Sequence, residues 1–310
     1  MYAAMNVVYS PRYHVDIGAH VFPTRKYQLV HARLLEAGIV TQADVIDPQP
    51  ASWDDLALIH TREYLEKIRH GTLTRDDLAQ LELPWSPEMV EGFRTMVGGT
   101  IEAARHAVAH RAVVAHIGGG LHHAFANHGE GFCPFNDVAV AIRVLQRDGE
   151  RVERAAVIDL DVHHGNGTAF LFESDPRVFT FSMHQQHNYP SWKPRSSLDV
   201  GLADGTGDSE YLQALEDALP KVMASNPDCL FYLAGADPFE HDQLGGLRLT
   251  RDGLRARDRL VIELARTTSL PLAIVLAGGY ARSVDDTVAI HAATIAEAAR
   301  AGQAGSLRAG

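Results

Sequence analysis

Cysteine is almost absent from this chain, because Cys133 and Cys229 are the only two among 310 residues. Two isolated cysteines cannot build a disulfide framework or a thiolate metal site. Long apolar runs are also missing, and none approaches the roughly 20 residues that a membrane-spanning helix needs. The N-terminus, MYAAMNVVYSPRYH, lacks the basic and then apolar regions of a secretory signal. These absences predict a cytoplasmic protein that does not enter membranes.

Positive charge is scarce as well. The sequence has 28 Lys and Arg against 39 Asp and Glu, which gives a formal net charge of -11. Nucleic-acid binding depends on clustered Lys and Arg, so we expect no nucleic-acid partner, although a cationic peptide remains a suitable substrate. The length and the 46% hydrophobic content suit one large globular domain. We expect that domain over residues 1–300 and a frayed tail of small and polar residues over 301–310.

Short apolar runs alternate with longer amphipathic stretches along the chain. The predicted strands are Val7–Tyr9, Val113–Ile117, Ala155–Leu160, Val178–Ser182, Cys229–Leu233 and Leu272–Leu276. The predicted helices between them include Pro87–His110, Asn136–Arg147, Ser209–Ala224 and Arg251–Thr267. Apolar strands that alternate with helices predict an α/β fold in three α/β/α layers around a mostly parallel sheet.

Five of these strands are followed directly by unusual polar segments. In chain order these segments are GGGLHH, DVHHGNG, MHQQHNYP, GADPFEHDQLGG and GGY. Open parallel sheets bind ligands beyond the carboxyl ends of their strands. Histidine, aspartate and glycine therefore gather at one edge of the predicted sheet, which indicates a site for chemistry there.

The segment that starts at Asp159 suggests a metal centre. Side chains alternate along a strand, so Asp159, Asp161 and His163 share one side. Asp237 adds a carboxylate at the end of another strand, and three protein ligands with an open fourth position are typical of catalytic zinc. The plainer interpretation is an acidic strand end with a capping His, and a helix cap at Asp237. The convergence of these residues favours a metal, with Zn²⁺ as the expected ion and Fe²⁺ as the alternative.

Further residues supply proton transfer and substrate contacts. Three glycines deliver His122 and His123, a pair suited to take a proton from water and return it to a leaving amine. Asp159 and Asn166 could each hold one of the two rings. Tyr280, after two glycines, could stabilise an oxyanion, although a packed Tyr is the plainer interpretation. Aromatic faces that could line a slot for an alkyl chain, or simply belong to the core, come from Gly131-Phe132-Cys133 and Tyr189.

With these residues in view, the sequence resembles the histone deacetylase family of the arginase–deacetylase superfamily, and within it class IV and its bacterial relatives. The motifs that carry the resemblance are HTREYLEKI, GGGLHHA, GFCPFNDVAVAI, VIDLDVHHGNGT, LAGADPFEHDQLGG and AGGY. The resemblance implies an arginase/deacetylase-like fold, with residues 1–300 as a single catalytic domain. It also implies zinc-dependent hydrolysis of N-acyl amines, with acyl-lysine as the first expectation.

Matched residue by residue, the resemblance also implies roles. Asp161, His163 and Asp237 match the zinc ligands. The catalytic positions fall on His123 as general base and acid, His122 with its partner Asp159, and Tyr280 as the oxyanion-stabilising Tyr. Tunnel positions fall on Gly131 and Phe132, with Tyr189 opposite. A structural K⁺ would be held at Asp159, Asp161, His163, Ser182 and Met183.

The sequence departs from the class I pattern in three places. Asn166 replaces an Asp, which predicts that His123 is a weaker base. Glu82 is the one candidate for the acidic residue that grips the peptide backbone in class I enzymes. Lys26, next to Arg25, replaces an Arg that lines an acetate exit. The flexible Lys stem and the class IV resemblance predict that acyl chains longer than acetyl are accepted.

Three alternatives stay open at this stage. The substrate could be an acylated polyamine or another small acylated amine instead of a protein. An arginase-type ureohydrolase would use two metals, but Gly165 stands where a second-metal ligand is expected. A non-catalytic module that reads acyl-lysine would not need intact ligands, a His pair and Tyr280.

Overall fold

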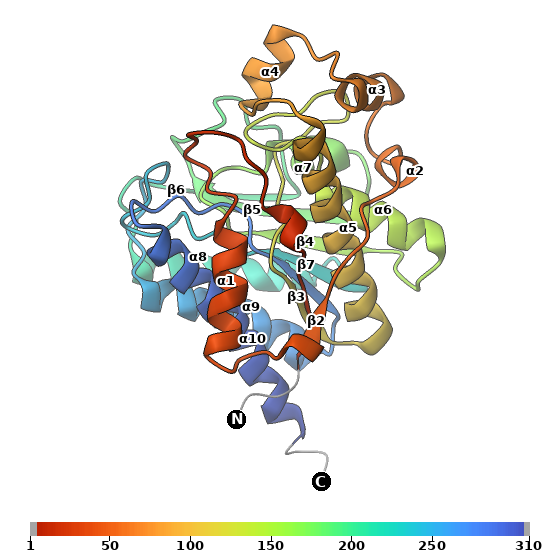
Figure 1. The fold of residues 1–310 in the computed structure, drawn as a ribbon. Helices are drawn as coiled ribbons and strands as arrows, with labels where there is room; N and C mark the ends of the chain where they lie inside the picture. Colours follow the sequence, from red (N-terminus) through yellow and green to blue (C-terminus); the bar gives the residue numbers. More distant parts are fainter. Residues whose placement is uncertain (1–4, 307–310) are drawn as a thin grey trace.

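A computed structural model describes residues 5–306 of the chain, with side chains through residue 300. In this part of the chain, eight strands form one sheet in which every neighbouring pair is parallel (Figure 1). The strands are β1 Val7–Val8, β2 Val45–Ile46, β3 Val113–His116, β4 Ala155–Asp159, β5 Val178–Gln185, β6 Leu198–Leu202, β7 Cys229–Leu233 and β8 Leu272–Val275. Their order is β2-β1-β3-β8-β7-β4-β5-β6, so the predicted parallel sheet is confirmed.

Helices cover both faces of the sheet. The α-helices are α1 Lys26–Glu36, α2 Trp53–Leu56, α3 Arg62–His70, α4 Arg75–Leu81, α5 Pro87–His110, α6 Asp137–Asp148, α7 Asn166–Phe172, α8 Asp208–Met223, α9 Arg251–Thr268 and α10 Val284–Ser306. Two short 3₁₀ helices span Pro11–Tyr13 and Gln42–Asp44. Helices α5 and α6 pack together on one face, and α1, α8, α9 and α10 form the other layer (Figure 1). This arrangement is the predicted three-layer fold.

The central strands are apolar because they are buried on both sides. Every residue of β4 (AAVID) and β7 (CLFYL) is buried, so these strands show no alternation of polar and apolar residues. Local signals set the helix ends. Ser86 accepts a hydrogen bond from the Met89 backbone N–H and Pro87 begins α5, while Asn136 caps α6 from the position before its first residue.

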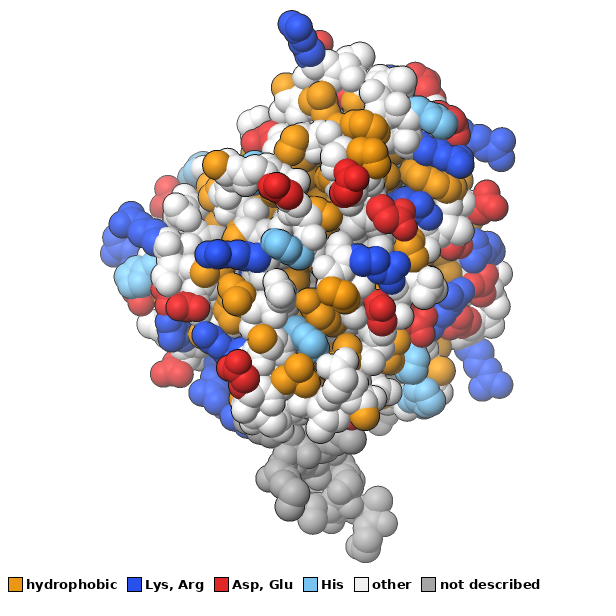
Figure 2. All heavy atoms as spheres, in the orientation of Figure 1, with side chains coloured by type: hydrophobic (Ala, Val, Ile, Leu, Met, Phe, Trp, Pro, Cys, Tyr) orange, Lys and Arg blue, Asp and Glu red, His pale blue; other side chains and the backbone are white. Residues whose placement is uncertain are grey.

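The end of the described chain is helical. Helix α10 runs through Ser306 and thus continues into the segment 301–310 that was expected to be a frayed tail, whereas residues 307–310 lie outside the described part. Within residues 5–306, no helix combines the length and the apolar character needed to cross a membrane. On the face drawn in Figure 2, basic and acidic side chains alternate instead of gathering by sign.

The carboxyl ends of the strands meet the loops that carry the predicted chemistry. The loops after β3, β4, β5, β7 and β8 start at this edge, as the parallel pairing requires. The C-terminal end of α4 closes over them, because the backbone N–H groups of Gly131 and Phe132 donate to the carbonyls of Gln80 (3.2 Å) and Leu81 (2.9 Å). The end of α4 therefore holds the loop at residues 131–132 in place over the strand ends.

Candidate active site

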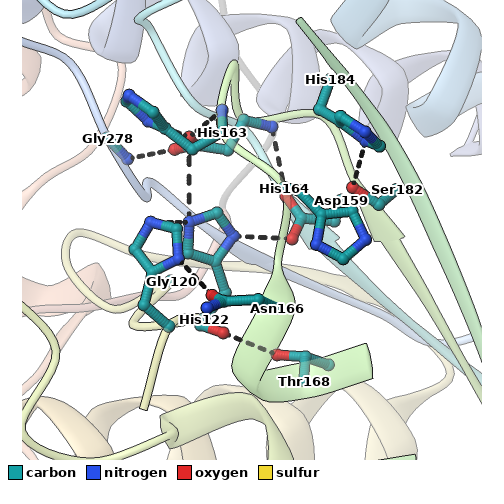
Figure 3. Close-up of polar contacts among 12 residues, drawn as sticks. Gly120, His122, Asp159, His163, His164, Asn166, Thr168, Ser182, His184 and Gly278 are labelled. Atoms are coloured by element: carbon teal, nitrogen blue, oxygen red, sulfur yellow. Dashed lines mark hydrogen bonds and ion pairs between the residues drawn. The ribbon is translucent and has the colours of Figure 1, made fainter. Parts of the chain in front are cut away.

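Three of the predicted ligands form one buried cluster. Asp161 and His163 follow β4 and Asp237 follows β7, which is the neighbouring strand in the sheet. One ligand atom from each residue lies within 4.8 Å of the other two. Nδ1 of His163 is 3.0 Å from Asp161 Oδ1 and 3.6 Å from Asp237 Oδ2 (Figure 3 shows His163).

The chemistry of this cluster fits a divalent cation. Asp237 Oδ2 is buried and has no hydrogen-bond partner within the described residues, although a buried carboxylate oxygen normally needs one. Burial and the neighbouring Asp161 carboxylate both raise the pKa of Asp237, so the two acids repel in their charged forms. A cation between them would remove that repulsion. One imidazole and two carboxylates are ligands that zinc accepts.

The surrounding backbone fixes the ligands. The Gly278 N–H donates to Asp161 Oδ2 (2.8 Å), and the Val162 N–H donates to Asp237 Oδ1 (2.9 Å). A Cβ at position 278 would overlap carboxylate oxygens of both Asp161 and Asp237, which explains the glycine in the AGGY motif.

Arg257, a residue that the sequence analysis did not single out, binds backbone carbonyls at the ends of the same two strands. Its fully buried guanidinium donates to the carbonyl of Gly235 (2.6 Å) and reaches that of Leu160 (3.4 Å). It is paired with Asp258, its sequence neighbour, at 2.7 Å. One buried ion pair therefore joins the ends of the two strands that carry the ligands.

The histidine pair lies beside the cluster with a different partner for each ring. Nδ1 of His122 is 2.7 Å from Asp159 Oδ2, and Nδ1 of His123 is 2.7 Å from Asn166 Oδ1. The two Nε2 atoms are 3.0 Å apart. Asp159 and Asn166 thus hold the rings that the sequence analysis assigned to them (Figure 3). Gly120, at φ +83°, makes the sharp turn that precedes the pair.

The two partners give the two rings opposite properties. Burial would lower the pKa of His122, but the carboxylates of Asp159 and Asp161 raise it to about 9. Burial, His122 and His163 together lower the pKa of His123 well below its ordinary value. At neutral pH, His122 is therefore the charged ring and His123 the neutral one, which leaves His123 able to accept a proton.

Glu130 stands behind Asn166 and was not predicted from the sequence. Its Oε1 accepts hydrogen bonds from Asn166 Nδ2 (2.6 Å) and from the Tyr189 hydroxyl (3.0 Å), and its Oε2 accepts from Gln80 Nε2 (3.0 Å). Glu130 belongs to an irregular loop, so neither periodicity nor a metal-ligand pattern marked it. The one available signal was a lone acidic residue directly before the GFC motif.

A tunnel of about 170 Å³ leads to the cluster from the surface. Its walls include His123, His163 and the three predicted contact residues Gly131, Phe132 and Tyr189, with Tyr280, Glu82, Asn188 and Leu244 completing the lining. Gly131 has φ +52°, and a Cβ there would lie 2.8 Å from the His123 ring and 3.1 Å from Tyr189. A larger residue would therefore narrow the tunnel beside His123.

Tyr280 presents its phenol at the foot of this tunnel. Its ring centroid is 6.4 Å from that of His163 and 5.9 Å from that of Phe132. Burial, and then the nearby carboxylates of Asp161 and Asp237, raise the pKa of Tyr280 well above its ordinary value. The hydroxyl therefore keeps its proton and can donate a hydrogen bond, as an oxyanion-stabilising group must.

Around the cluster, the cavity almost closes. An inner space of about 20 Å³ is lined by Asp161, His163, the His pair and the glycine loop, together with Phe22, Tyr27 and Tyr280. Lys26 is fully buried beside it and donates from Nζ to the Ala277 carbonyl (2.8 Å). Burial lowers the pKa of Lys26 to about 8. Arg25, the preceding residue in the sequence, is exposed and lines neither the tunnel nor the inner space.

Two of the residues predicted for K⁺ lie side by side on neighbouring strands. Asp159 and Ser182 are paired residues of β4 and β5, and Ser182 Oγ lies 3.0 Å from His184 Nδ1. A second group that could hold a metal comprises His164, His184 and Asp199. There His164 Nε2 already lies 3.2 Å from Asp199 Oδ1, so part of the donor set is satisfied internally.

Comparison with known proteins defines the family. The histone deacetylase domain model matches residues 20–295. A protein of Picosynechococcus that bears no functional name is 43% identical over 92% of this chain and 95% of its own length. Histone deacetylase 2 of Arabidopsis thaliana is 32% identical over 90% of this chain and 75% of its length.

Two further similarities agree. The acetoin utilization protein AcuC of Bacillus subtilis is 31% identical over 83% of this chain and 72% of its length. The crystal structure of the HDA15 HD domain superposes with a TM-score of 0.78 and 24% identity, covering 94% of this chain and 90% of that chain. The chain belongs to the histone deacetylase family and is a hydrolase of that family. The resemblance given by the motifs is thereby confirmed.

Proposed function

We propose that this protein hydrolyses the acyl-lysine amide with zinc bound by Asp161, His163 and Asp237. The observation that carries the proposal is the tunnel, which is narrow, has two aromatic walls, and ends between the ligand cluster, His123 and Tyr280. An apolar slot of this kind suits the four-carbon stem of lysine, and the groups at its foot suit amide hydrolysis.

The residues divide the work as follows. A bound divalent ion would supply Lewis-acid activation of the acyl carbonyl and of water. His123 Nε2 accepts a proton from the attacking water and returns it to the leaving amine. Tyr280 donates its hydroxyl proton in a hydrogen bond to the oxygen that gains charge. His122, charged through Asp159, stabilises negative charge nearby. The products are a carboxylate and a free amine.

The inner cavity supports a short acyl group. Its volume of about 20 Å³ is little more than the 10–15 Å³ needed for one water. The methyl group of acetyl is of this size, whereas a fatty chain would have to displace Lys26 from the Ala277 carbonyl and from the rings around it. We therefore propose acetyl as the preferred group, in place of the longer chains that the Lys26 substitution suggested.

The mouth of the tunnel supports a peptide substrate over a small amine. A groove of about 820 Å³ shares Glu82, Asn188 and Tyr189 with the tunnel, and it extends past Trp192 and Lys193. A small acylated amine would leave this groove empty, whereas a peptide would continue into it. The Glu82 carboxylate lies at the junction, where it can accept hydrogen bonds from peptide N–H groups.

The ureohydrolase alternative loses support from one position. A Cβ at Gly165 would overlap Asp159 Oδ2, so there is no room for a second-metal ligand in the place where the arginase pattern needs one. His123 is neutral and Tyr280 keeps its proton, and both lie beside the buried ligand cluster. These properties favour a catalytic site over a non-catalytic module that only binds acyl-lysine.

The test is turnover of one peptide that carries acetyl-, octanoyl- or myristoyl-lysine, with acetylated spermidine as the small-amine competitor. We expect kcat/KM to be highest for the acetyl peptide. Asp237→Asn should abolish turnover and lower bound zinc, measured by elemental analysis, with unchanged far-ultraviolet circular dichroism. A preference for acetylated spermidine, or a rise from acetyl to myristoyl, would overturn the substrate assignment. Two tightly bound metals per chain would favour the ureohydrolase.

A further inference from the structure

We infer that Glu130 is a positioning residue that sets the proton arrangement on His123 through the side-chain amide of Asn166. This inference rests on the proposed function, in which His123 is the base. It concerns a residue outside the ligand cluster and outside the His pair. The contacts that carry it form a line from Glu130 through Asn166 to His123.

An amide differs from a carboxylate in having two unlike ends. If Asn166 turns its oxygen toward His123, the ring must donate from Nδ1, and Nε2 keeps a lone pair that can accept a proton. If the amide is flipped, its NH₂ group faces Nδ1, the proton moves to Nε2, and His123 cannot act as a base there. An Asp in this position has no such ambiguity.

The charged His122 ring, whose Nε2 lies 3.0 Å from His123 Nε2, favours the Nδ1–H form, and Glu130 fixes the amide that must match it. It does so because an ionised carboxylate only accepts hydrogen bonds. With Oε1 only 2.6 Å from Asn166 Nδ2, a flipped amide would bring two acceptor oxygens together. Burial opposes ionisation of Glu130, but its hydrogen-bond donors lower its pKa below the ordinary value. These donors are His128, Asn166, Gln80 and Tyr189. The carboxylate is thus charged at neutral pH and holds the NH₂ end of Asn166.

The same oxygen also holds a wall of the tunnel. The Tyr189 hydroxyl donates to Glu130 Oε1 at 3.0 Å, and the Tyr189 ring meets the His123 ring edge-on, with centroids 5.0 Å apart at 89°. Glu130 therefore restrains His123 by two routes, one through Asn166 and one through the packed ring. Both routes act on orientation, and neither brings Glu130 to the reacting atoms.

The first test reads the tautomer directly. Ring-nitrogen chemical shifts of ¹⁵N-histidine protein would be recorded in the zinc-loaded form, with the His123 signals assigned by their loss in His123→Ala. We expect the Nδ1–H form in the native protein and a growing share of the Nε2–H form in Glu130→Gln. Gln can offer either end to Asn166, so it no longer selects one orientation. An unchanged tautomer in Glu130→Gln would overturn the inference, and this result does not depend on finding the substrate.

The second test is a double-mutant cycle with Asn166→Asp. In the native background, Glu130→Gln should lower kcat by on the order of 10-fold with little change in KM, as supporting partners of an active-site His commonly do. In the Asn166→Asp background, the same change should raise kcat, because it removes a carboxylate that repels Asp and replaces it by a donor. Equal losses in both backgrounds would mean that Glu130 is merely structural.

Glu216→Gln serves as the matched control. It makes the same chemical change at an exposed position of α8 that lines neither the tunnel nor the groove. We expect kcat within about twofold of the native value, since changes at exposed surface positions are usually small. A loss as large as that of Glu130→Gln would overturn the assignment of the effect to the contact with Asn166. Failure of every acyl-lysine substrate would instead reject the proposed function while leaving the tautomer test intact.

Discussion

His122 and His123 are neighbours in the sequence and in space, yet the protein treats them in opposite ways. Asp159 partners the first ring with a carboxylate, and the pKa of His122 rises to about 9. Asn166 partners the second with a neutral amide, so burial and then the charges of His122 and His163 lower the pKa of His123 well below its ordinary value. Burial is nearly equal, at 3% and 5% exposed. The charge of the partner, more than a difference in burial, therefore decides which ring stays neutral.

The largest effect should separate the two rings by their roles. His123→Ala removes the group that moves the proton and should lower kcat by about 10²–10⁴. His122→Ala removes only a stabilising charge, so we expect a smaller loss. Both variants would be compared with the native enzyme on the acetyl-lysine peptide. If His122→Ala were the more damaging change, the assignment of the base to His123 would be reversed.

A third buried histidine sharpens the comparison, because it has no charged partner at all. His60 Nδ1 lies 2.9 Å from the Phe125 carbonyl, and Nε2 accepts from the Asn136 N–H at 3.1 Å. Burial lowers its pKa to about 4. The unfolded chain takes up a proton near pH 6.5 and the folded one does not, so stability is lost as pH falls from about 6.5 to 4. The full contribution is about 3 kcal/mol.

Urea unfolding at pH 7 and pH 4.5 measures this contribution. In His60→Asn, the difference in unfolding free energy between the two pH values should be smaller than in the native protein. Asn keeps a donor for the Phe125 carbonyl and does not titrate. His70, which is exposed on α3, gives the control variant His70→Asn, with the native pH dependence expected. An undiminished difference in His60→Asn would mean that other groups account for the acid sensitivity.

The smallest effect comes from giving His123 the kind of partner that His122 has. Asn166→Asp places a carboxylate beside Nδ1 of His123 and should raise the pKa of the ring by about 1 unit. The base works in its neutral form, so the acidic limb of the kcat/KM profile should move to higher pH. The change is made with Glu130→Gln, so that two carboxylates do not meet. A limb that stays in place would show that residue 166 does not control the ring.

The central part of the fold could be predicted because strands that are buried on both faces have apolar residues at consecutive positions. Strands β3, β4, β7 and β8 are continuous apolar runs, and their predicted positions agree with the structure to within about a residue at each end. The edge strands β2 and β6 were missed. The first is two residues long, and the second, Leu198–Leu202, contains Asp and Gly and is partly exposed, so neither has the apolar run of a central strand.

The candidate site divides in the same way. Asp161, His163 and Asp237 could be found because they follow strands whose ends must meet. Glu130 could not, since it contacts Asn166 across 36 positions of sequence and lies in a loop whose path depends on tertiary packing. The close approach of Gly278 to two carboxylates also depends on tertiary packing, so the AGGY motif alone does not reveal it.

The buried Arg257 has a consequence for how the ion enters and leaves. Because it joins the carbonyls of Leu160 and Gly235 beneath the ligands, the liganding loops are anchored to the sheet and not to the ion. Exchange of a bound ion would then need only protonation and deprotonation of side chains in a pre-shaped cavity, with no refolding step. Such a rigid cavity accepts ions of similar size and ligand preference, so the metal supply of the cell, more than the fold, would choose between Zn²⁺ and Fe²⁺.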